Sequence, residues 1–279
     1  MDTDFRAWIG RTERIDDAMA PAQAEAAQAT LDEPGPPMAT GAELPLPWHW
    51  FHFLPRVPQA ALDADGHPQR GGFLPPIPYP RRMFAGSRLR VHRPLRVGTP
   101  AVREGTIRDV VLKSGKSGAL AFVTVAYRFE QDGLLCLEEE QDIVYREPGA
   151  PVPAPRVAEL AALPAGCWSR TLVPDTRLLF RFSAITFNAH RIHYDRAYAA
   201  EVEGYPGLVV HGPLTAALLL QLVRQSTPRP VVAFGFRGLA PLFDGLPLRL
   251  VGRPEGDAVA LEAQASDGSV ALAATATLG

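Results

Sequence analysis

The segment 211-HGPLTAALLLQLVRQ-225 decides the fold, because its apolar side chains would fall on every face of a helix. An amphipathic surface helix keeps one polar face, so this pattern predicts a helix that is buried on all sides. Pro213 suits the first turn, where no intrahelical N–H bond is needed. Four strand-like segments follow, separated by the turn signals FDG, PEGD and SDG. A buried helix followed by an antiparallel meander is the outline of a hotdog fold. The four segments are VVAFGFRGL (231–239), LPLRLVGR (246–253), AVALEAQA (258–265) and VALAATATL (270–278).

The first half of the chain has a similar series of predicted strands, joined by KSGKSG and QDG. A faint echo links Arg93-x-Leu95 and Gly98-x-Pro100 to Arg237-x-Leu239 and Gly245-x-Pro247. The proline-rich stretch 146-REPGAPVPAPR-156 reads as a linker. We therefore predict an α+β fold of two tandem hotdogs, with domains at 1–150 and 160–279. The predicted strands are VHRPLRVGTP (91–100), GTIRDVVLKSG (105–115), ALAFVTVAYRFEQ (119–131), LLCLEEEQDIVYRE (134–147) and RLLFRFSAIT (177–186).

Charge and composition exclude several classes of function. Lys and Arg number 28 against 30 Asp and Glu, so no long-range field would attract nucleic acid or an anionic membrane surface. No apolar run approaches a membrane span, and the N-terminus lacks a secretory segment, so we expect a cytoplasmic protein. The two cysteines, Cys136 and Cys167, belong to no metal or disulfide pattern.

The polar segment 187-FNAHRIHYD-195 is the candidate site. Hydration of a double bond conjugated to a thioester needs a base for the water, a partner that orients the water, and donors for the enolate oxygen. His193, Asn188 and the backbone of Gly212 at the helix start are candidates for these three tasks. The alternatives are a polar corner without chemistry, or a metal site. A metal site would have three ligands in this segment, His190, His193 and Asp195, and its fourth ligand would have to be His211.

The stretch 182–199 resembles the signature of the MaoC-like, R-specific enoyl-CoA hydratase family. The matching residues are Phe182, Ile185, Thr186, Ile192, His193 and Ala199. The family has Gly-Asp and Asn-Pro where this chain has Phe187-Asn188 and His190-Arg191. The resemblance implies a catalytic pair at Asn188 and His193, and an oxyanion hole at His211-Gly212. Because an asparagine cannot accept a proton, we expect His193 to take the water proton while Asn188 positions the water.

Two longer stretches, 183–214 and 65-DGHPQRGGFLPPIPYPRRMFAG-86, resemble a subgroup of that family. It contains mesaconyl-CoA, 3-methylfumaryl-CoA and itaconyl-CoA hydratases and mitochondrial 3-hydroxyacyl-thioester dehydratases. The resemblance implies an acyl-CoA substrate, no metal and no redox cofactor. It also implies that the N-terminal half is a degenerate hotdog that helps to form the substrate tunnel.

We therefore expect a hydro-lyase that hydrates a short, branched, dicarboxylate-derived enoyl-CoA. The second carboxylate would need a cation. The substrate-binding candidates are Arg181, Arg191, Arg81, Arg82 and Tyr205. The first alternative is a 3-hydroxyacyl-CoA or acyl-carrier-protein dehydratase that acts on unsubstituted chains. A thioesterase that uses Asp195 or Glu201, or a non-catalytic thioester-binding protein, would also suit the fold. We expect a homodimer or higher homo-oligomer.

Overall fold

The helix predicted from the apolar segment is α4, Gly212–Ser226, in the computed structural model, which describes residues 4–115 and 118–279. Every residue of α4 from Leu214 to Val223 is buried. The helix packs against strands of both halves of the chain. This confirms the prediction of a helix without a solvent-facing side.

The other helices are short, and most of the strands follow one another in two series, β2 to β6 and β7 to β10. The 3-10 helices are η1 (Phe5–Trp8), η2 (Trp48–Phe51), η3 (Gln59–Ala61) and η4 (Arg191–His193). The remaining α-helices are α1 (Pro21–Leu31), α2 (Thr176–Ile185) and α3 (Arg196–Glu201). The strands of the first half are β1 (Thr12–Asp17), β2 (Arg81–Val91), β3 (Ala101–Gly115), β4 (Gly118–Gln131) and β5 (Leu134–Arg146). Those of the second half are β6 (Trp168–Leu172), β7 (Val231–Gly238), β8 (Leu248–Glu255), β9 (Ala258–Gln264) and β10 (Val270–Leu278).

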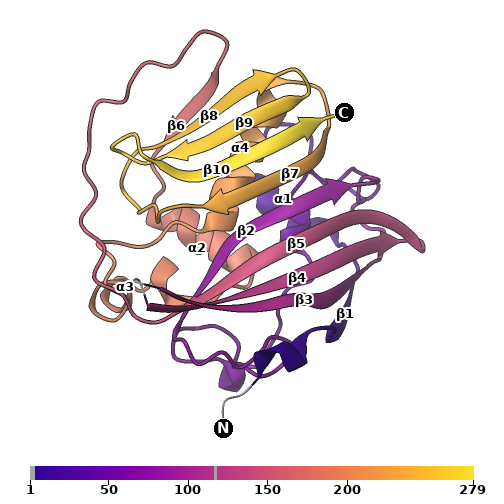
Figure 1. The fold of residues 1–279 in the computed structure, drawn as a ribbon. Coiled ribbons are helices and arrows are strands. Elements are labelled where there is room, and N and C mark those ends of the chain that lie inside the picture. The colour runs from indigo at the N-terminus through magenta and orange to yellow at the C-terminus, as the bar shows by residue number, and fades with distance from the viewer. Residues whose placement is uncertain (1–3, 116–117) are drawn as a thin grey trace.

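Ten strands form one antiparallel sheet in the order β1-β3-β4-β5-β2-β7-β10-β9-β8-β6. The two halves meet where β2 pairs with β7, as Figure 1 shows. A Cβ atom on Gly86 would lie 2.4 Å from the carbonyl oxygen of Phe236, so glycine allows the two strands to approach here. This pairing covers the sheet edge that each half would otherwise expose. The sheets of the two halves thus pair edge to edge, whereas the domain boundaries 1–150 and 160–279 stay a prediction.

Two local predictions were wrong. The segment 177–186 lies in α2 and is not a strand: the carboxylate of Asp175 caps the helix by accepting from Leu178 N at 2.9 Å. Leu179 and Phe182, three residues apart, form its buried side.

The segment 91–100 leaves the sheet at the end of β2 and forms a loop. Pro94 cannot donate to a strand ladder, and Gly98 has a positive φ of 77°. The predicted turn KSGKSG (113–118) includes positions 116 and 117, which lie outside the described residues.

Both cysteines are free thiols. No helix within residues 4–115 and 118–279 has the length and apolar character of a membrane span.

Candidate active site

A cavity of about 520 Å³ lies where the two halves meet. The second half brings the predicted polar segment and the start of α4 to its wall, and the first half brings a loop and the start of β2. Residues that matter for the chemistry are His67, Arg82, Asn188, His190, His193 and Gly212. The site is therefore shared between parts of the chain that are far apart in sequence.

The loop that carries Asn188 is a tight turn at the end of α2. Asn188 N donates to the carbonyl of Ser183 at 2.8 Å, and Phe187 before it has a positive φ of 50°. The side-chain oxygen of Asn188 accepts from His190 N at 3.0 Å. Its side-chain NH₂ group is left to donate toward the cavity. Asn188 is thus suited to hold a water oxygen, but its carbonyl oxygen is already used to shape the turn.

His193 has the geometry of a neutral base. Its Nδ1 lies 2.7 Å from the carbonyl oxygen of Val209. Because a carbonyl can only accept, Nδ1 must carry the proton, and Nε2 therefore has a free lone pair. Burial lowers the pKa of His193 to about 4, although the bond to Val209 opposes the shift. The ring is held by stacking on His211, with ring centres 3.6 Å apart.

The start of α4 leaves room for a ligand at Gly212. His211 is the N-cap residue, and the first backbone N–H groups of the helix have no intrahelical acceptor. A Cβ atom on Gly212 would meet only the carbonyl oxygen of Phe84, at 3.8 Å, within 4 Å. The His211 side chain anchors the helix start, since its Nε2 lies 2.8 Å from Ser183 Oγ. Burial, with the nearby His193 and His190, lowers the pKa of His211 well below 6.5, so its ring is neutral.

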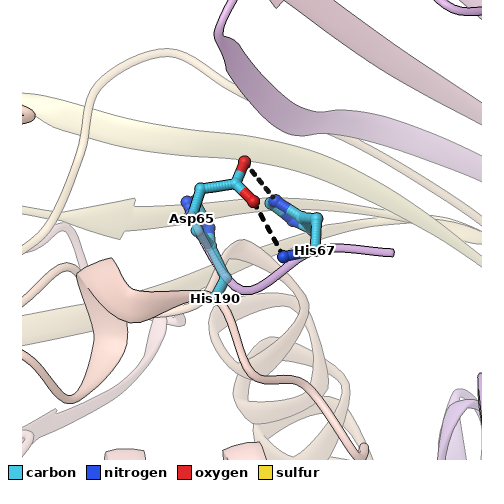
Figure 2. Close-up of side chains that lie close together, drawn as sticks. All are labelled: Asp65, His67 and His190. Atoms are coloured by element: carbon cyan, nitrogen blue, oxygen red, sulfur yellow. Dashed lines mark hydrogen bonds and ion pairs between the residues drawn. The ribbon is translucent and has the colours of Figure 1, made fainter. Parts of the chain in front are cut away.

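The structure also brings Asp65 and His67 together with His190 of the predicted segment, and Figure 2 shows these three side chains. His67 donates to both Asp65 oxygens, from Nδ1 at 3.1 Å and from its backbone N at 2.8 Å. The His67 and His190 rings lie 4.1 Å apart. Asp65 and His67 were not predicted as site residues. The only signal was an Asp-x-His pair inside a stretch rich in proline and glycine.

The pKa shifts indicate which groups of this cluster carry a charge. Burial opposes the ionisation of Asp65, but the side-chain and backbone hydrogen bonds from His67 prevail and lower the pKa of its carboxyl group. Burial and the charges of Arg82 and Arg70 lower the pKa of His67, against the opposing effect of Asp65. Burial, together with the neighbouring imidazoles of His67 and His193, lowers the pKa of His190 to about 2. The cluster therefore has one negative charge, on Asp65, next to two neutral imidazoles.

The donor atoms of Asp65, His67 and His190 lie within 4.8 Å of one another, a spacing that could hold a metal ion. The metal ligands considered from the sequence were His190, His193, Asp195 and His211, and of these His190 alone belongs to this cluster. The Asp195 carboxylate caps α3 by accepting from Tyr198 N at 3.0 Å and pairs with Arg191 at 2.7 Å. Both Asp65 oxygens are already bonded to His67, which satisfies them without an ion.

The arginine candidates differ in position. Arg181 is exposed on α2, Arg191 pairs with Asp195, and Arg81 is buried in an ion pair with Glu203 at 3.2 Å. Arg82 alone among the four candidates lines the cavity. Tyr205 lines it as well. Two further cavity arginines, Arg103 and Arg146, were not predicted.

Comparison with known proteins identifies the relatives of this chain. The family model described as hydroxyacyl-thioester dehydratase type 2 matches residues 47–244. Mesaconyl-C(4)-CoA hydratase of Chloroflexus aurantiacus is 63% identical over 276 residues, which cover 99% of this chain and 98% of that protein. The mitochondrial hydroxyacyl-thioester dehydratase type 2 of Schizosaccharomyces pombe is 28% identical over 229 residues, covering 73% and 75%.

Solved structures identify the fold. A MaoC-like dehydratase matches with a TM-score of 0.74 and 15% identity, covering 98% of this chain and 99% of that one. A protein of Mycobacterium tuberculosis described as having a double hotdog fold matches with a TM-score of 0.59 and 14% identity, covering 97% and 96%. The predicted double hotdog fold is confirmed.

Proposed function

The chain belongs to the hydroxyacyl-thioester dehydratase type 2 family, and we propose that it is a hydro-lyase that hydrates an enoyl-CoA of the mesaconyl-C(4) type. The relative at 63% identity supports the substrate class. The observation that carries the proposal is the neutral His193, which keeps Nε2 free in the same cavity as the start of α4.

The proposed reaction uses one base. His193 Nε2 takes a proton from water while the water oxygen bonds to the β-carbon of the acyl group. The electrons of the double bond move to the thioester oxygen, which accepts a hydrogen bond from the N–H of Gly212. The Asn188 NH₂ group donates to the water oxygen and fixes its position. The His193 imidazolium, with a pKa of about 4, is acidic enough to return the proton to the α-carbon.

The same steps in reverse dehydrate a 3-hydroxyacyl thioester, so the direction depends on the substrate supplied. A thioesterase has less support, because neither of its candidate carboxylates lines the cavity. Asp195 caps α3, and Glu201 is exposed at the end of that helix. No metal or redox cofactor takes part in the proposed reaction. The cytoplasmic location and the homo-oligomeric state stay predictions.

The test follows the loss of conjugated enoyl absorbance with mesaconyl-C(4)-CoA. His193→Ala should lower kcat roughly a hundredfold or more, the usual contribution of a positioned acid–base group. His92→Ala is the matched control, because His92 lies on the surface in a pair with Glu138. Full activity of His193→Ala would show that the base is another residue. Release of free CoA without hydration would instead favour a thioesterase.

A further inference from the structure

The chemistry of the proposed substrate sets a requirement for the site. In a mesaconyl-C(4) thioester the β-carbon carries both a methyl group and the second carboxylate. Water attacks that same β-carbon, so the carboxylate must lie beside the water when the reaction occurs. A group that recognises this carboxylate therefore has to lie next to His193 and Asn188, and not at the distant CoA end.

The strand β2 carries Arg82 two residues before Phe84, which lies against the start of α4. The carbonyl of Phe84 faces the position of a Cβ atom on Gly212, at 3.8 Å. Arg82 and Phe84 are two residues apart on β2, so their side chains point to the same face, and both line the cavity. Two residues of a strand span roughly 7 Å. This separation is comparable with the distance between the thioester oxygen of a bound substrate and a side chain that donates a hydrogen bond to its β-carboxylate.

The charges near the water position favour an anion. His67, His190 and His193 have lowered pKa values and are neutral at neutral pH. Arg82 lines the same cavity as His67 and His190, and its charge contributes to the lowering of both pKa values. Arg82 makes no ion pair with any residue in the described part of the chain.

The acidic groups near this position are already hydrogen-bonded. Asp65 does not line the cavity, and both its oxygens accept from His67. Among the described residues that line the cavity, Glu139 is the single acidic one. Its oxygens accept hydrogen bonds from Trp50, Ser87 and Gln141 and face His49 Nε2 at 2.9 Å. Position 188, beside the base, holds a neutral amide. A carboxylate at that position would repel a second carboxylate on the β-carbon.

We propose that Arg82 binds the β-carboxylate of the substrate, and that the neutral Asn188 admits this negative charge beside the attacked carbon. The two residues together select dicarboxylate-derived enoyl thioesters over neutral ones. This inference rests on the proposed hydratase function and adds the residues that determine its substrate class.

The experiment compares two thioesters that differ in one group. Fumaryl-CoA carries a carboxylate on the β-carbon, and crotonyl-CoA carries a methyl group there. For each variant the measured quantity is the ratio of kcat/KM for fumaryl-CoA to kcat/KM for crotonyl-CoA. Arg82→Met should lower this ratio by roughly 10- to 100-fold, the range expected for one lost charge-assisted hydrogen-bonded pair. Arg82→Lys should lower it less, because the charge is kept and only the bidentate geometry is lost.

The variant Asn188→Asp tests the proposed role of the neutral amide independently of Arg82. The introduced carboxylate should also lower the ratio, because it repels fumaryl-CoA and not crotonyl-CoA. Arg90→Met is the matched control, since Arg90 is an exposed arginine on the same strand. Removal of its positive charge should leave the ratio as in the unaltered protein. Circular dichroism identifies any variant that has not folded, and Arg82→Gln then replaces Arg82→Met.

The possible results distinguish a failure of the proposed hydratase function from a failure of the role proposed for Arg82. If the unaltered protein does not hydrate mesaconyl-C(4)-CoA, the proposed function fails. If it hydrates fumaryl-CoA and crotonyl-CoA, and Arg82→Met lowers both kcat/KM values equally, Arg82 serves CoA or the scaffold and the inference fails. Arg146→Met tests the other cavity arginine that has no ion pair in the described part of the chain. A larger change of the ratio in Arg146→Met than in Arg82→Met would also overturn the assignment.

Discussion

Gly66 is expected to be the most sensitive glycine of the site, because it allows the loop of Asp65 and His67 to contact the loop of Asn188. Its φ is +92°, and a Cβ atom added there would lie 1.7 Å from the carbonyl oxygen of Ala189. No real Cβ atom approaches an oxygen so closely, so Gly66→Ala must separate the two loops. The separation would break the bond from Arg191 N to the Asp65 carbonyl, at 2.9 Å, and that from Arg191 Nη1 to the Ala64 carbonyl, at 3.1 Å.

The expected magnitude has two parts. A left-handed conformation costs an alanine roughly 1–2 kcal/mol relative to glycine. Each lost hydrogen bond contributes about 1 kcal/mol, so the separation adds about 2 kcal/mol. Gly66→Ala should therefore lower the free energy of unfolding by about 3–4 kcal/mol. The kcat/KM for hydration should fall as well, because His67, His190 and Asn188 would no longer keep their positions.

The matched control is Gly71→Ala in the same loop. Gly71 has nearly the same φ, +91°, but an added Cβ atom would make only an ordinary contact, 3.7 Å from Pro76 Cβ. This variant should show the conformational cost alone. Urea unfolding, followed by tryptophan fluorescence, measures both free energies. If Gly66→Ala proves no less stable and no less active than Gly71→Ala, the close approach of the two loops is not a feature of the protein.

Two further predictions concern the base and the oxyanion site. His193 must be neutral to accept a proton, and its pKa is about 4. The hydration rate should therefore stay constant from neutral pH to about pH 5 and decrease at lower pH. A decrease centred near pH 6.5 would show that the pKa of the histidine is not shifted. Because this pKa lies below the unfolded value, the unfolded chain binds more protons below pH 6.5 and stability also declines there, so each rate needs a circular dichroism check. Gly212→Ala should reduce turnover with little change in Tm, because the protein leaves space for a Cβ atom at this position. Gly212→Val should abolish turnover, and a large loss of Tm in Gly212→Ala would assign Gly212 to packing.

The parts of the fold that were predictable are those in which the apolar pattern has one interpretation. In α4 the run of apolar residues is too long for a strand, and β7 to β10 are separated by clear turn signals. The strand prediction for the segment 177–186 was wrong because a short apolar run is compatible with either a strand or a helix. There the capping carboxylate of Asp175 and the burial of Leu179 and Phe182 decide for a helix, and the burial depends on the tertiary structure.

The predictability of the site follows the same division. His193, Asn188 and Gly212 come from one continuous stretch of sequence, and all three line the cavity. Asp65 and His67 come from a loop more than a hundred residues earlier, and tertiary contacts such as that of Arg191 N with the Asp65 carbonyl bring this loop to the site. The adjacent residues Arg81 and Arg82 could not be distinguished by sequence. Their opposite orientation on β2 sends one to Glu203 and the other to the cavity.

This division has a consequence for how the substrate class is set. The proposed base, the water-holding amide and the oxyanion donor all belong to the second half of the chain, whereas Arg82 belongs to the first. Arg82 lies on β2, the strand that pairs with β7, so the Arg82 side chain lines the cavity although it takes no part in the proposed proton transfer. A substitution at the start of β2 can therefore change which acyl group is accepted while the groups that move the proton stay in place. The first half is thus expected to act as the specificity element of the enzyme, and the second half as its hydration element.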